Sequence, residues 1–174
     1  MELNELQKDC ARRQKRGLHF ILASIVIWGL ILAVQLTNLT TEQKNLAVFC
    51  CSAVLFPLAW GLSKMLKIDF EGKGNPLTKA GILFSINQML YILIAMWVYA
   101  AVPEKMVMVY AMIFGAHLMP FSWLYQSNSY MVFSIIVPIA SLILGLMYPP
   151  YVLAAIMMVI EAVFSACLFR ECAK

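Results

Sequence analysis

One acidic residue stands alone inside a long apolar run. Glu161 is the only charged residue of the run 151–169, which is long enough to cross a bilayer. At a rise of 1.5 Å per residue, Glu161 lies roughly 15 Å below the start of that run. A charge at this depth costs on the order of 3 kcal/mol and normally faces a partner or a water-filled cavity. The residue is therefore either part of a proton, cation or substrate site, or a protonated side chain that joins two helices.

Three other polar residues fall at a similar depth. His117 lies about eleven residues into its apolar run, while Asn87 and Gln88 lie about seven or eight residues into theirs. A histidine beside Glu161 could pair with the carboxylate or carry a proton in a relay. The two amides could orient that pair or bind a substrate, but they could equally join neighbouring helices by hydrogen bonds.

Helical phase adds two tyrosines to this polar layer. Because successive residues turn by about 100°, Gln88 and Tyr91 share a stripe with Asn87 at its margin, and Tyr110 aligns with His117. If the stripes converge, they enclose an aromatic- and methionine-lined cavity, although such stripes are also typical of plain packing. The predicted substrate or proton site comprises six residues: Glu161, His117, Asn87, Gln88, Tyr91 and Tyr110.

The composition is that of an integral membrane protein. Of the 174 residues, 63% are hydrophobic and 13% are charged, and the mean hydropathy is +0.82. A soluble domain is nearer half apolar and a quarter charged. The net charge of +4 is too small to indicate nucleic acid binding. The five cysteines include no CxxC pair and do not form a disulfide framework.

These observations predict an all-α bundle of six transmembrane helices. A basic, amphipathic cytoplasmic lead-in helix is expected over 1–17, and a cytoplasmic tail over 170–174. The transmembrane domain between them, 18–169, contains six apolar runs, each too long and too continuous for a barrel strand. The runs are 18–36, 46–66, 80–101, 106–125, 131–147 and 151–169.

The positions of the basic residues predict the orientation. Of the 13 Lys and Arg residues, all except Lys44 and Lys105 fall on the side that carries both termini. By the positive-inside rule that side is cytoplasmic, which predicts a multi-pass protein of the plasma membrane. We expect the basic cluster of the lead-in segment to contact anionic lipid headgroups; its members are Arg12, Arg13, Lys15 and Arg16.

Three prolines lie within predicted helices, where each removes a backbone donor and can kink the helix. They are Pro57, Pro120 and Pro138. The segments 55–59 and 136–140 around Pro57 and Pro138 resemble each other, and they occupy the middle helices of two three-helix halves. This pattern suggests two inverted halves, as in inverted-repeat transporters.

Metal and cofactor chemistry find little support in the sequence. A catalytic metal needs three or four convergent ligands, whereas the chain has two histidines, and His19 lies near the cytoplasmic surface. No metalloprotease, nucleophile-elbow, P-loop or dinucleotide-binding motif is present. We therefore expect no metal and no cofactor, and we assign no catalytic residue. An enzyme stays open as the less favoured class.

Two stretches carry a family resemblance: GAHLMPFSWLY at 115–125 and KRGLHFILAS at 15–24. With these stretches the chain resembles a family of small bacterial six-helix membrane proteins of unknown function. The resemblance covers nearly the whole chain and implies a fold and a membrane location. It implies no catalytic residue.

The first functional interpretation is a small transporter or exporter, with proton coupling through Glu161 as one version. The first alternative is a non-catalytic binding or accessory subunit with a lipid or small-molecule ligand. The second is a membrane enzyme that acts on a lipid or quinone. Ala162 and Ala166 form a small-xxx-small pair that could pack within the chain or between copies in a homo-oligomer.

Overall fold

The structure, a computed structural model, describes residues 2–70, 72 and 74–173. These residues form α-helices and short 3₁₀ turns, and no strand occurs among them. Six helical segments are long and apolar enough to span a membrane, which confirms the predicted all-α, six-helix membrane architecture. Their bounds are Lys15–Gln35, Thr41–Met65, Thr78–Ala101, Pro103–Leu124, Asn128–Met147 and Pro150–Cys172.

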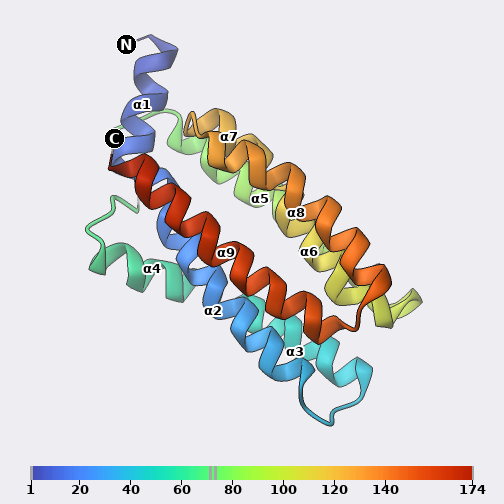
Figure 1. The fold of residues 1–174 in the computed structure, drawn as a ribbon. Helices are drawn as coiled ribbons and strands as arrows, with labels where there is room; N and C mark the ends of the chain where they lie inside the picture. The colour runs from blue at the N-terminus through green and yellow to red at the C-terminus, as the bar shows by residue number, and fades with distance from the viewer. Residues whose placement is uncertain (1, 71, 73, 174) are drawn as a thin grey trace.

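An antiparallel helix pair from the two ends of the chain forms the centre of the bundle (Figure 1). Helix α2 (Leu18–Gln35) packs along α9 (Pro150–Cys172). Helices α3 and α4 pack on α2, α6 packs closely on α8, and α5 lies against α6 and α7. The bounds of these helices are Thr41–Ala53 for α3, Leu55–Met65 for α4, Thr78–Ala101 for α5, Met106–Ala116 for α6, Met119–Leu124 for α7 and Asn128–Met147 for α8.

Two of the six membrane-length segments are broken near a proline. A proline ring clashes with the carbonyl four residues earlier, and α3 ends at Ala53, four residues before Pro57. In the same way, α6 ends at Ala116, four residues before Pro120. Pro138 instead lies inside the continuous helix α8. The two prolines of the suggested repeat therefore differ in effect, and the inverted halves stay a prediction.

Close backbone approach joins α6 to α8. A Cβ atom on Gly115 would lie 2.6 Å from Cδ of Pro138 and 2.7 Å from Cβ of Val137. Such distances are too short for a side chain, so only glycine allows the two helices to meet here. This contact holds α8 against α6 next to the break at His117.

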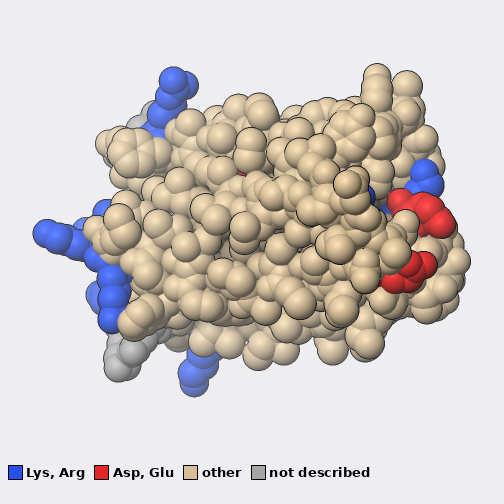
Figure 2. Space-filling view, turned by 90° about the horizontal axis from the view of Figure 1, so that it is seen from below, with Lys and Arg blue, Asp and Glu red and all other residues tan. Residues whose placement is uncertain are grey.

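Most charged residues on the surface lie at the two ends of the bundle. Figure 2 shows Lys and Arg side chains gathered at one end, while acidic side chains are prominent at the other, with an apolar surface between them. We call the end with both termini the basic end (Figure 1). Lys73 and Lys174, which the sequence assigns to that side, lie outside the described residues, as do Met1 and Glu71.

The short helix α1 (Leu3–Arg13) is tied to the basic end by side-chain hydrogen bonds. Gln7, which is 6% exposed, donates from Nε2 to the carbonyl of Trp123 at 2.8 Å. Asn75 donates from Nδ2 to the carbonyl of Leu6 at 2.8 Å and to Asp9 at 3.0 Å. The expected lead-in helix is therefore held by the end of α7 and by the loop before α5.

A left-handed turn connects α1 to α2. Lys15, Arg16 and Gly17 have φ values of 44°, 49° and 68°, and the two non-glycine residues are strained in this conformation. The Lys15 ammonium donates to the carbonyl of Leu66 at 2.7 Å, and the carbonyl of Arg16 accepts from the Tyr130 hydroxyl at 2.8 Å. These contacts hold the strained turn against α4 and α8.

Glu171 joins this turn to the start of α8. Its carboxylate accepts from the hydroxyls of Ser127 at 2.6 Å and Ser129 at 2.7 Å, and from the backbone N–H of Ser129 at 3.0 Å. Nε of Arg16 lies 3.6 Å from the same carboxylate. A carboxylate at a helix N-terminus is favoured by the helix dipole. Glu171 therefore fixes the end of α9 to α2 and α8.

Candidate functional site

Glu161 lies in the middle of α9 and faces α2. Its side chain is 0% exposed, and its Oε2 atom lies 2.7 Å from the hydroxyl oxygen of Ser24. The two residues are 137 positions apart in the chain, so this contact connects the first and last membrane-length segments. The lone charge of the apolar run thus sits in the interface of the central helix pair.

The Ser24 hydroxyl lies within hydrogen-bond distance of two oxygen atoms. Ser24 Oγ also lies 2.7 Å from the carbonyl oxygen of Ile21, and a hydroxyl has only one proton to donate. Both contacts are hydrogen bonds when Ser24 donates to Ile21 and a protonated Glu161 donates to Ser24. The geometry therefore suits a neutral carboxyl.

The second carboxyl oxygen has no partner among the described residues. Oε1 of Glu161 is buried without a hydrogen bond, and the same is true of the Ser165 hydroxyl one turn further along α9. An unsatisfied buried polar atom typically costs about 1–3 kcal/mol. Helix packing alone does not need such an atom. Glu161 Oε1 and the Ser165 hydroxyl can therefore still form a hydrogen bond with water or a ligand.

His117 lies at the break between α6 and α7 and does not bind Glu161. Within the described part of the chain its buried Nδ1 atom has no hydrogen-bond partner. Its ring contacts Phe114 and Phe121, with centroid distances of 5.3 and 6.1 Å. Phe114 in turn makes an edge contact with Trp28, one turn after Ser24 on α2. Aromatic rings thus connect His117 to Trp28 of α2.

Two of the three predicted residues of α5 bind each other. Asn87 is exposed on the bundle surface and donates from Nδ2 to the Tyr91 hydroxyl at 2.8 Å. Gln88 is half-buried on the side of α5 that faces the bundle. The main packing partners of α5 are α6 and α7, so these three residues belong to a different part of the molecule from Glu161.

Tyr110 makes its polar contact with α3. Its hydroxyl lies 2.6 Å from that of Ser52, and its ring lies 5.8 Å from Trp28. The structure therefore spreads the six predicted residues over four places: Glu161 pairs with Ser24, Tyr110 pairs with Ser52, three residues lie on α5, and His117 lies among aromatic rings. No cluster of three His, Cys, Asp or Glu side chains suited to a metal occurs among the residues described.

Ser24 was not among the residues predicted from the sequence, although its depth along α2 could have indicated it. Ser24 is the seventh residue of α2, so the depth count used for Asn87 and Gln88 places it at a comparable height. A single serine in an apolar helix is common, however, and only the pairing of α2 with α9 gives it a role.

Two titrating groups lie outside the membrane-length segments, on α1. Hydrogen bonds from Arg13 at 2.9 Å and Asn75 hold the pKa of the Asp9 carboxyl below its usual value. Burial raises the pKa of the Cys10 thiol to about 11. At neutral pH Asp9 is therefore ionised and Cys10 is an unreactive thiol.

Six apolar helices of membrane length, with a buried carboxyl between two of them, define a multi-pass membrane protein. A family model described as a family of unknown function, DUF7010, matches residues 3–171, and the chain belongs to this family. The resemblance to a family of unknown function is thereby confirmed over nearly the whole chain. No curated protein and no solved structure matches this chain.

Proposed function

We propose that this protein is a small proton-coupled transporter in which Glu161 binds and releases the coupled proton. One observation carries the proposal: the Glu161 side chain is fully buried at mid-helix, yet its Oε1 atom has no hydrogen-bond partner among the residues that the structure describes. Ionisable residues inside a membrane typically mark proton or substrate pathways. A carboxyl that can still accept a water molecule or a ligand suits that role.

The proton cycle follows from the Ser24 contact. With α2 and α9 together, a protonated Glu161 donates to Ser24, whose own proton goes to the carbonyl of Ile21. When the two helices separate and water reaches Oε1, the charged form becomes solvated and the proton leaves. Return to the closed state requires a proton or a cation, which couples the movement of the helices to binding at Glu161.

Broken helices support this proposal. The segments α3–α4 and α6–α7 each span the bundle in two pieces. Discontinuous helices in transporters place backbone groups near a mid-membrane site and act as hinges. At the break, the Nδ1 atom of His117, which has no hydrogen-bond partner in the described part of the chain, lies beside such a hinge.

We further propose that the basic end faces the cytoplasm of the cell and that the protein lies in the plasma membrane. The gathering of Lys and Arg side chains at one end of the bundle in Figure 2 supports this orientation, because positive residues are retained on the cytoplasmic side. Single-cysteine variants would test it. An impermeant thiol reagent added to intact cells should label Lys44→Cys and leave Lys79→Cys unlabelled, and the reverse pattern would overturn the orientation.

Tight packing around Glu161 favours one second candidate, a non-catalytic binding or accessory protein. Trp28, Met157 and Phe164 are at most 1% exposed. In this alternative the Glu161–Ser24 contact only fixes two helices. The protein would then undergo no proton-linked change.

Proton movement in vesicles separates the two candidates. We would reconstitute the protein in vesicles that contain a pH-sensitive dye and add inorganic cations and amphiphilic cations in turn. The transporter proposal expects a compound that moves protons with the wild type and with Glu104→Gln, an exposed carboxylate control, but not with Glu161→Gln. Equal proton movement in Glu161→Gln would exclude Glu161 as the coupling residue. No response to any compound would favour the accessory protein.

A further inference from the structure

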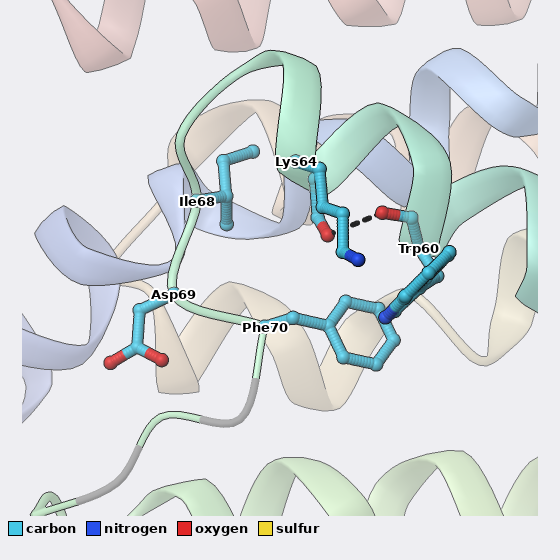
Figure 3. A pocket seen from close by; sticks show the side chains of 6 residues that line it. Trp60, Lys64, Ile68, Asp69 and Phe70 are labelled. Atoms are coloured by element: carbon cyan, nitrogen blue, oxygen red, sulfur yellow. Dashed lines mark hydrogen bonds between the residues drawn. The ribbon is translucent and has the colours of Figure 1, made fainter.

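A pocket at the basic end combines aromatic rings with a lysine. It has a volume of about 460 Å³ and is lined by the end of α4 and the residues that follow it: Trp60, Ser63, Lys64, Ile68, Asp69 and Phe70. Figure 3 shows the Trp60 and Phe70 rings next to each other, with the Lys64 ammonium directed toward them. Nζ of Lys64 lies 3.6 Å from the Trp60 ring centroid.

The apolar wall of this pocket continues onto the membrane-facing surface. Trp60 is 52% exposed and Phe56, one turn earlier on α4, is 51% exposed. Phe20 of α2 contacts Phe56 and Phe70, with centroid distances of 5.9 and 5.8 Å. An acyl chain could therefore lie along α4 while its polar head remains in the pocket.

The charges of the pocket favour an anionic head. Asp69 is already engaged, because its Oδ1 accepts from the N–H of Gly72 at 2.9 Å, and Figure 3 shows its carboxylate directed away from the rings. Lys64 is exposed and makes no salt bridge among the residues described. Lys15, whose ammonium binds the carbonyl of Leu66, adds positive charge nearby.

We propose that this pocket binds an anionic membrane lipid, with its phosphate at Lys64 and its acyl chain along Trp60 and Phe56. A lysine at a membrane surface attracts anionic lipid, and an indole ring suits the boundary between headgroups and acyl chains. This site is separate from Glu161 and does not depend on proton coupling.

Fluorescence quenching by lipids with brominated acyl chains tests the proposal. The signal of Trp60 is the difference between the wild type and Trp60→Phe, measured for the full chain in a neutral detergent. We expect brominated phosphatidylglycerol to quench Trp60 in a saturable way. Lys64→Gln should raise the half-saturating concentration about fivefold, and Lys64→Arg should largely restore binding.

Lys79→Gln is the matched control, because Lys79 is an exposed lysine at the same end but outside the pocket. It should leave the half-saturating concentration unchanged. Three results would each overturn the proposal: equal weakening by Lys64→Gln and Lys79→Gln, equal quenching by brominated phosphatidylcholine, or equally strong competition by glycerol phosphate, which has no acyl chain. The last result would assign the pocket to a free phosphate compound.

Discussion

Glu161 of α9 and Ser24 of α2 share a short hydrogen bond, 2.7 Å between Oε2 and Oγ, in the interface of the central helix pair. Ser24 is itself 2.7 Å from the carbonyl of Ile21. Both contacts are hydrogen bonds at the same time when a neutral Glu161 donates to Ser24 and Ser24 donates to Ile21. The Glu161–Ser24 contact thus joins the first and last membrane-length segments.

Removal of the Ser24 hydroxyl should weaken this helix pair. We expect Ser24→Ala to lower the free energy of unfolding by about 1 kcal/mol, the order found for hydrogen bonds between membrane helices. Ser165→Ala is the matched control, because the Ser165 hydroxyl lies buried on α9, one turn from Glu161, without a hydrogen-bond partner among the described residues. That variant should be neutral or slightly stabilising in a detergent unfolding titration. Equal losses in both variants would contradict the assigned hydrogen bond.

A methyl group on Gly115 should separate α6 from α8. The added Cβ atom would meet Val137 and Pro138, and overpacking of this kind typically costs about 1–3 kcal/mol. Gly61→Ala on α4, where the added Cβ atom would meet no neighbouring helix within 4 Å among the residues described, should instead be neutral or stabilising, because alanine favours a helix. The same unfolding titration measures both, and an unchanged Gly115→Ala would show that the two helices do not approach this closely.

The attachment of α1 should weaken in acid. Because Arg13 and Asn75 lower the pKa of Asp9 in the folded protein, the stabilisation from Asp9 is complete above about pH 4 and is lost as the pH falls through the folded pKa. Melting temperatures of the wild type and Asp9→Asn should therefore differ by a constant amount near neutral pH and converge in acid. A difference that grows on acidification would contradict the assigned contacts.

Loss of the Glu171 carboxylate should loosen the start of α8. Glu171→Gln weakens the charge-assisted bonds to Ser127, Ser129 and Arg16, and we expect a loss of about 1–2 kcal/mol in the free energy of unfolding. Hydrogen exchange at the Ser129 amide should become faster. Glu104→Gln, an exposed carboxylate at the opposite end, should change neither quantity; the same change there would point to an effect of net charge alone.

Sequence patterns predicted the helices because an apolar run of membrane length has one stable solution in a bilayer. Which helices contact each other was harder to predict. Depth counting gives the height of Asn87 on its helix but not the helix it faces, and α5 packs mainly on α6 and α7. The Glu161–Ser24 pair depends on a contact between the two ends of the chain, for which no local pattern exists.

The prolines show the same limit. Pro120 and Pro138 lie in similar apolar surroundings in the sequence, yet α6 ends before Pro120 whereas α8 continues through Pro138. The two prolines also differ in their packing, since Pro138 lies against the backbone of Gly115 in α6. Helix breaks of this kind depend on neighbours that the local sequence does not specify.

Infrared spectroscopy of the Glu161 carboxyl tests the central claim most directly. A protonated carboxyl has a C=O stretching band that a carboxylate lacks, and comparison of the wild type with Glu161→Gln assigns that band. We predict a Glu161 band at neutral pH, altered in Ser24→Ala, that shifts when the protein is transferred to D₂O, because the proton exchanges with water during opening. Absence of the band, or a band that never exchanges, would contradict a proton-carrying Glu161.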